Sequence, residues 1–144
     1  MPARAKTSHC ACLRLRKASR RVTQIYDQHL EPYGLTVTQF SLLGHLKTLD
    51  GIAIGTLADT LVMDPTTLNR VLKPLQTKGW VASTTDEQDA RTRHLHITGT
   101  GLAIHGEAKP GWLAAQDKIA RALGRDDNQR FADIMDLLLE RLAD

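Results

Sequence analysis

Residues 54–81, IGTLADTLVMDPTTLNRVLKPLQTKGWV, carry the pattern that decides the fold. Asp64 followed by Pro65 predicts a helix start, because the aspartate can accept from the free N–H groups of the first turn and proline has no N–H that needs a partner there. Gly79 predicts the end of that helix. A shorter helix is predicted over residues 55–61. Two helices joined by so short a turn indicate a helix-turn-helix, whose second helix can enter a DNA groove.

The second of these helices has one apolar and one polar face. Its leucines and its valine repeat at helical spacing, which predicts a buried stripe. The other face is rich in hydrogen-bond donors, and no acid occurs between Asp64 and Asp86. Arginine can bond to guanine or phosphate, asparagine can bond to adenine, and threonine can donate to phosphate or contact a thymine methyl group. The candidate DNA contacts on this face are Thr66, Thr67, Asn69, Arg70 and Lys73.

Two alternating segments, residues 80–85 and 93–98, follow this helix. They predict a two-stranded hairpin, and residues 52–54 are long enough for a small third strand beside it. A hairpin directly after such a helix indicates a winged helix-turn-helix. An ordinary helical hairpin followed by a solvated turn is the plainer alternative, and the basic face of the helix argues against it.

The hairpin tip, DEQDARTR, is polar and charged. Arg91 and Arg93 can reach the minor groove or the phosphates beside the helix. Asp86 and Asp89 would be poor DNA contacts. We expect them to form the wing ion pair, fixing the arginines by charge-assisted hydrogen bonds.

The remaining segments predict more helices. Residues 9–30, 36–49, 99–123 and 126–142 are expected to be helical, and residues 1–8 to be flexible. The last helix is apolar over so much of its circumference that it must pack on more than one neighbour, and a second copy of the chain is the natural partner. We expect a mostly α fold of about six helices with a two- to three-stranded sheet, and a dimer formed by the N- and C-terminal helices.

The two ends of the chain carry opposite charge. Residues 1–26 contain basic side chains and no acid, whereas residues 126–144 are mainly acidic. Two separate solvated faces would account for this opposite charge. Contact between the two ends of the chain, within one subunit or between subunits, would account for it as well.

Residues 57–81 and 86–101 resemble the MarR (multiple antibiotic resistance regulator) family of winged-helix regulators. The wing pattern D-x-R-x-R at residues 89–93, ending in T-x-x-G at residues 98–101, is the most specific part. The resemblance implies a homodimeric repressor that binds a pseudo-palindromic operator and is released by a small ligand. Ala90 stands where the family usually has a second basic residue, which leaves Arg91 as the main wing candidate.

The resemblance covers nearly the whole chain and implies a single domain over residues 1–144. Residues 9–31 and 99–144 would be dimerisation helices, and residues 36–97 would be the DNA-binding lobe. In this family, small effectors commonly bind between these two parts. Such a pocket would hold a small aromatic or phenolic effector. The candidate lining residues are Arg16, Arg20, His29, Tyr33, Phe40, His45 and Trp112. Such side chains are more often core or surface residues than ligand contacts.

A second type of switch rests on Cys12. Together with residues 18–20, Thr23, Tyr26, Thr36 and Gln39, it is similar to the organic-hydroperoxide-sensing (OhrR-type) branch of the family. This implies that Cys12 is a peroxide-sensing thiol and that Tyr26 of the other subunit is its hydrogen-bond partner. Nearby arginines would favour the reactive thiolate. Arg16 and Val37 replace two further tyrosines of that branch, and a small buried structural cysteine is the alternative.

Length and composition exclude several classes of protein. The 144 residues, 42% of them hydrophobic, suit one globular domain, and the net charge of +3 is compatible with a nucleic-acid partner. No apolar run approaches the roughly 20 residues of a membrane span, so we expect a cytoplasmic protein. We expect neither enzyme activity nor a cofactor, since no phosphate loop or catalytic constellation occurs, and no metal site. A dimerisation module of an enzyme and a winged helix that binds protein instead of DNA remain alternatives.

Overall fold

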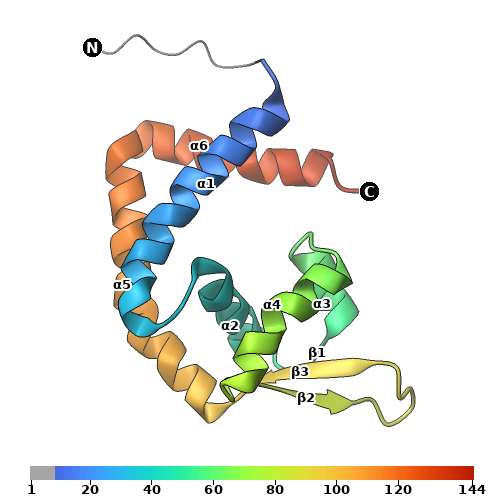
Figure 1. Cartoon of the computed structure of the whole chain (residues 1–144). Helices are drawn as coiled ribbons and strands as arrows, with labels where there is room; N and C mark the ends of the chain where they lie inside the picture. Colours follow the sequence, from blue (N-terminus) through green and yellow to red (C-terminus); the bar gives the residue numbers. More distant parts are fainter. Residues whose placement is uncertain (1–8) are drawn as a thin grey trace. The chain divides into compact units, whose positions relative to one another are not determined.

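The computed structural model describes residues 9–144, and the expected flexibility of residues 1–8 lies outside the described residues. Figure 1 shows a mostly helical chain with one small antiparallel sheet. This confirms the predicted winged-helix fold class. The elements are α1 (Ala11–Leu30), the short 3-10 helix η1 (Glu31–Tyr33), α2 (Val37–Thr48), β1 (Ile52–Ala53), α3 (Ile54–Thr60), α4 (Pro65–Thr77), β2 (Val81–Thr85), β3 (Arg93–Ile97), α5 (Gly99–Leu123) and α6 (Arg125–Arg141).

The chain divides into two compact units. The sheet-bearing unit is Leu30–Pro110, and the terminal unit consists of the chain up to His29 together with Gly111–Asp144. The division falls inside α5, which runs as one helix through Pro110. The first part of α5, up to Pro110, thus belongs to the sheet-bearing unit, and the dimerisation role expected of residues 99–144 stays a prediction.

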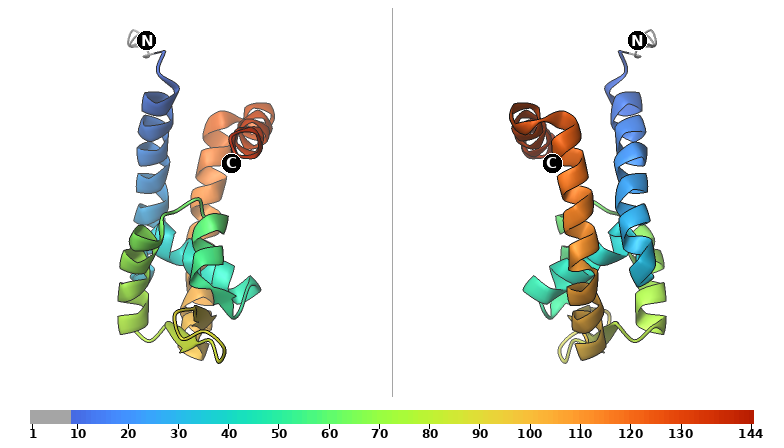
Figure 2. Two further views of the ribbon diagram at one scale, coloured as in Figure 1. Left: turned by 90° about the vertical axis from the view of Figure 1, so that its right-hand side faces the viewer. Right: turned by 90° about the vertical axis from the view of Figure 1, so that its left-hand side faces the viewer.

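The sheet-bearing unit has a complete core of leucines. The strands are ordered β1-β3-β2, and all neighbours are antiparallel. Helices α2, α3 and α4 gather on one side of this sheet (Figures 1 and 2). Fully buried leucines come from each of these helices and from the central strand: Leu42, Leu43, Leu46, Leu57, Leu68, Leu72, Leu75 and Leu95.

Local sequence signals set the helix ends, and those at Asp64 and Gly79 are as predicted. Thr36 and Gln39 form a capping box at the start of α2. Asp64 caps α4 with Pro65 in its first turn, and Gly79 follows the end of α4 in a left-handed conformation, φ 73°. Such a φ is easily adopted by glycine because it has no Cβ.

The terminal unit buries much less of its apolar surface. No side chain of α6 is buried, and large apolar side chains of this helix and of Leu142, directly after its end, are exposed: Phe131, Ile134, Leu139 and Leu142. Within this unit, Figure 2 shows α6 standing apart from α1. Among the described helices, none is long and apolar enough to cross a membrane.

Candidate nucleic-acid interface

Helix α4 presents a basic, acid-free face to solvent. Thr66, Asn69, Arg70 and Lys73 are all exposed on it. Neither Arg70 nor Lys73 has an ion-pair partner within residues 9–144. Cations that are not neutralised by their own protein are free to displace counterions from phosphates. The opposite face of α4 is held in the core by its buried leucines, so this polar face has a fixed direction.

Thr67 has a structural contact that the sequence analysis did not anticipate. Its hydroxyl donates to Asp64 Oδ2 at 2.6 Å and its backbone N–H donates to Asp64 Oδ1 at 2.9 Å. These bonds lower the pKa of Asp64, the hydroxyl contact being the largest cause. Because the only hydroxyl proton is used by the cap, Thr67 is not a free donor to phosphate.

The turn before α4 is tight and strained. Val62 has φ 52°, and the Met63 N–H donates to the Ala58 carbonyl at 2.9 Å. A β-branched residue rarely adopts a positive φ, so the surrounding contacts must impose it. Met63 therefore closes the end of α3 and fixes where α4 begins.

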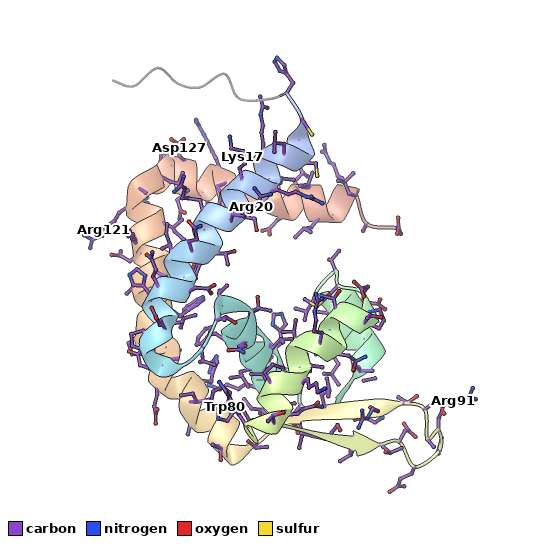
Figure 3. The ribbon with its side chains drawn as sticks, viewed as in Figure 1. Lys17, Arg20, Trp80, Arg91, Arg121 and Asp127 are labelled. Atoms are coloured by element: carbon purple, nitrogen blue, oxygen red, sulfur yellow. The ribbon has the colours of Figure 1, made fainter. Side chains whose placement is uncertain are left out.

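The wing tip is folded around two carboxylates. Asp86 Oδ1 accepts from the N–H groups of Gln88 and Asp89, and Asp89 Oδ1 accepts from the N–H of Arg91. Figure 3 shows Arg91 at the far end of the hairpin. Its side chain is 95% exposed, and its Nε lies 3.7 Å from Asp89 Oδ1. Because both side chains are exposed, this ion pair contributes little to folding stability, and the Arg91 guanidinium is available to a binding partner. Arg93, at the start of β3, is exposed too.

The expected pairing of Asp86 with an arginine is wrong: its partner is a histidine. Asp86 Oδ2 lies 2.9 Å from His94 Nε2, and His94 Nδ1 lies 2.9 Å from the Gly51 carbonyl oxygen. The Asp86 hydrogen bond is the main cause that raises the pKa of His94, and the same bond is the main cause that lowers the pKa of Asp86. The Gly51 partner of His94 is 43 residues away in the sequence, so no local pattern around β3 indicates this contact.

The residues of the T-x-x-G pattern join the wing to α5. Thr98 Oγ1 donates to the Gly79 carbonyl at 2.6 Å and accepts from the Gly101 N–H at 3.0 Å. A Cβ on Gly101 would collide with the Trp80 carbonyl oxygen. Both residues of the pattern therefore hold the end of α4 against the start of α5.

The predicted effector-pocket residues are divided between the two units. Arg16 and Arg20 line an open hollow of about 430 Å³ on α1, together with Leu15 and Ser19; Figure 3 labels Arg20 on this helix. Phe40 is instead a core residue that stacks on His105, with ring centroids 4.5 Å apart.

The other pocket candidates differ in their surroundings. His29 and His45 each place Nδ1 within hydrogen-bond distance of a carbonyl in their own helix, while Tyr33 and Trp112 are half-buried. His29 and Trp112 belong to the terminal unit, whereas Tyr33 and His45 belong to the sheet-bearing unit.

Both cysteines lie at the start of α1, and neither takes part in a disulfide within the described residues. Cys10 and Cys12 are exposed in the single chain, so a buried structural Cys12 would need to be covered by a second chain. Tyr26 lies 14 residues further along the same helix, which puts it about 21 Å from Cys12 along the axis. A contact between them therefore needs a second chain. Burial raises the pKa of Tyr26. No group of three or more metal-binding side chains occurs in the described part of the chain.

Comparison with known proteins shows a consistent set of relatives. Residues 35–92 match the model of the MarR family. The HTH-type transcriptional regulator SarZ of Staphylococcus haemolyticus is 29% identical over 112 residues, which are 78% of this chain and 74% of SarZ. The Mycobacterium tuberculosis transcriptional regulator MosR, solved in complex with DNA, superposes with a TM-score of 0.79 at 34% identity, covering 89% of this chain and 92% of MosR.

The fold is also shared with more distant proteins. The PcaV transcriptional regulator from Streptomyces coelicolor, solved with its natural ligand, superposes with a TM-score of 0.81 at 20% identity. The match covers 92% of this chain and 93% of PcaV.

Proposed function

This chain belongs to the MarR family of transcriptional regulators, and we propose that it is a repressor that binds a pseudo-palindromic operator as a homodimer. The observation that carries the proposal is the exposed basic face of α4. Asn69 and Arg70 are proposed to contact bases, and Thr66 and Lys73 to contact phosphates. Arg91 and Arg93 of the wing are proposed to contact the adjacent minor groove or its phosphates. The proposed role is regulatory, not enzymatic. We assign the protein to the cytoplasm because its proposed partner is chromosomal DNA.

Fluorescence anisotropy on labelled DNA from upstream of the protein's own gene tests this role. Arg70→Ala should weaken binding by roughly 5- to 150-fold if Arg70 contacts a base, which corresponds to about 1–3 kcal/mol. Arg121→Ala is the matched control, because Arg121 is exposed on α5 and paired with Asp117 at 2.8 Å. Equal affinities of both variants and the wild type would contradict DNA binding through α4, and absence of binding at low salt would contradict the regulator role.

The exposed apolar stripe of α6 supports the homodimer. Ile134 is 56% exposed and Leu142 72% exposed in the single chain, and surfaces of this kind mark protein interfaces. The basic side chains of α1 and the acidic ones of α6 offer complementary charge for the same contact. A twofold axis would place two copies of α4 about 34 Å apart, one turn of DNA.

The dimer can be tested by sedimentation over a range of protein concentrations. Ile134→Asp should shift the equilibrium toward monomer, because it places a charge in the apolar contact. Gln129→Glu adds the same charge on the polar side of α6 and should leave the dimer intact. A monomeric wild type, or an unchanged Ile134→Asp dimer, would contradict this assignment.

We propose a small aromatic or phenolic ligand as the releasing signal, with thiol oxidation as the second candidate. The arginines of the α1 hollow favour an effector with a carboxylate. The exposure of Cys12 favours oxidation: an organic hydroperoxide would transfer one oxygen to the thiol, giving a sulfenic acid and the corresponding alcohol.

Repeating the DNA titration after hydroperoxide treatment separates these signals. Loss of binding in the wild type but not in Cys12→Ser would establish the thiol switch. If oxidation changes neither protein, Cys12 is not the sensor, and titration with aromatic carboxylates becomes the decisive measurement.

A further inference from the structure

Two histidines link the outer face of the sheet to its neighbouring segments. His94 connects the Gly51 carbonyl, in the turn before β1, to Asp86 at the base of the wing tip. His96 connects Asp50 of the same turn to Thr84 of β2, with His96 Nδ1 3.2 Å from Asp50 Oδ1 and Nε2 3.0 Å from Thr84 Oγ1. The two rings thus form parallel bridges across the sheet, but their chemical partners differ.

Both partners of His94 can only accept hydrogen bonds. A carbonyl oxygen and an ionised carboxylate have no proton to offer, so each ring nitrogen of His94 must carry one. A neutral imidazole has a single N–H and would leave one of the two contacts without a proton. The arrangement around His94 therefore matches the doubly protonated, positively charged ring.

His96 has no such requirement. One of its partners is the Thr84 hydroxyl, which can donate as well as accept. A neutral ring can donate from Nδ1 to Asp50 and accept at Nε2 from Thr84. The two histidines are two residues apart on one strand, so His96 is a natural internal control.

The Asp86 carboxylate connects His94 to the wing tip. Its Oδ1 holds the N–H groups of Gln88 and Asp89, and its Oδ2 is the atom that contacts His94. Asp89 in turn holds the backbone of Arg91. A continuous series of hydrogen bonds therefore runs from Gly51 through His94 and Asp86 to the segment that carries the exposed arginine.

We infer that His94 is a positioning residue of the wing that acts as an imidazolium, so that DNA binding weakens when the ring loses its proton. The inference rests on the proposed function, since it assumes that the wing contacts DNA. Deprotonation removes one of the two bonds of His94. The series of hydrogen bonds from Gly51 to the wing tip is then broken on one side of the ring, and the fraction of molecules with Arg91 correctly placed falls.

The sign of the pH effect follows from the two pKa shifts. The pKa of His94 is raised, so its bonds are present below the ordinary histidine range and are lost as the pH rises through the raised value. The pKa of Asp86 is lowered, so its carboxylate stays ionised until well into the acid range. Between these two limits, the pair is intact.

Other titratable groups lie on the elements around β3. Asp50 precedes β1 and is paired with His96, Asp59 is on α3, and Lys47 on α2 acts on His105. The hydrogen bond to Asp86 is the largest cause that raises the pKa of His94, followed by the bond to the Gly51 carbonyl, and the charge of Asp86 adds to both. Substitution of Asp86 is thus the most selective way to change this ring.

The decisive variant is Asp86→Asn. The asparagine oxygen can keep the two N–H bonds of the tip, and its amide can donate to His94 Nε2. A neutral His94 would then satisfy all its partners, so the ring would no longer need the second proton. DNA affinity should become nearly independent of pH, apart from a uniform gain from the lost negative charge.

DNA affinity is measured by anisotropy from about pH 6 to about pH 9, and the His94 ring is titrated by NMR over the same range. As the pH rises, wild-type affinity should fall at least about threefold. A fall of this size corresponds to a correctly placed wing in only roughly a third of the molecules. His96→Gln should retain this fall. In Asp86→Asn the fall should disappear, and the His94 pKa should move back toward about 6.5.

Three outcomes would overturn the inference. Wild-type affinity that does not change with pH, or an unchanged pH profile in Asp86→Asn, would show that the ring does not position the wing, while leaving DNA binding itself established. An NMR pKa of His94 that does not respond to Asp86→Asn would refute the charged bridge without any use of DNA. Absence of DNA binding at every pH would instead refute the proposed function.

Discussion

The sheet-bearing unit buries leucines from each of the helices α2, α3 and α4, whereas α6 of the terminal unit buries none of its side chains. Leu43 and Leu68 are fully buried, while Phe131 and Leu142 are 45% and 72% exposed. The first unit completes its core within one chain. The second has the same kind of apolar side chains but lacks something to cover them, which is the arrangement expected of an interface.

This difference predicts that the stabilities of the two units depend differently on protein concentration. A core made within one chain is present at any dilution, whereas burial between copies follows mass action. Substitutions in the two units should therefore affect different measurable quantities. The predictions below use this contrast, beginning with the largest effect.

Leu43→Ala should lower the free energy of unfolding by about 2–5 kcal/mol, because it leaves a cavity in a closed core. The control is Leu139→Ala on α6, which is 58% exposed. At low concentration this change should cost about 0.5 kcal/mol or less. Urea denaturation at several protein concentrations measures both. Equal losses at high dilution would contradict the contrast between the units.

Gly101→Ala should destabilise the protein by about 1–3 kcal/mol, because the added methyl meets the Trp80 carbonyl. Gly106→Ala, on the same helix with open space around it, should stabilise by up to about 1 kcal/mol through helix propensity. Thermal unfolding of the two variants should therefore give shifts of opposite sign. If Gly101→Ala leaves the thermal stability unchanged, the backbone at the junction between the wing and α5 can shift to accommodate the added methyl group.

The sheet-bearing unit should lose stability in mild acid through His105. Burial is the main cause that lowers the pKa of this ring, which stacks on Phe40. The unfolded ring takes up a proton below about pH 6.5 while the folded ring resists it, so stability falls from there to the lowered pKa. His105→Leu should flatten the pH profile of unfolding, and His45→Gln should preserve it. The sign is opposite to that of His94.

The smallest effect is expected at the ion pair between Arg121 and Asp117. Both side chains are largely exposed, and Asp117→Asn should cost about 0.5 kcal/mol or less in the free energy of unfolding. A double-mutant cycle with Arg121→Ala gives the pairwise energy. A coupling well above about 1 kcal/mol would show that this part of α5 is covered in the assembled protein.

The sequence predicted the features that depend on local chemistry. The Asp64 cap, the Gly79 stop and the alternation of β3 act through neighbours within a few residues, so their outcome can be read from short motifs. The polar face of α4 follows from the helical spacing of its apolar residues. The hairpin directly after this helix indicated the winged-helix arrangement, and the resemblance to a known family agreed with it.

The sequence could not predict contacts between distant segments. Nothing near His94 indicates that it meets Gly51, and charge alone suggested an arginine for Asp86. Thr67 was selected as a DNA donor because hydroxyls suit phosphates, but its side chain is turned to Asp64. Such choices between competing partners are made by three-dimensional packing.

The acid-free surface of α4 has a consequence for rates. From Pro65 to Thr85 the chain contains no negative charge, so DNA of any sequence attracts this face before a specific contact forms. Such attraction speeds the encounter and lets a protein slide along nonspecific DNA, and it weakens steeply as salt rises. The time this protein needs to find its operator is therefore set by the salt concentration as much as by the operator sequence.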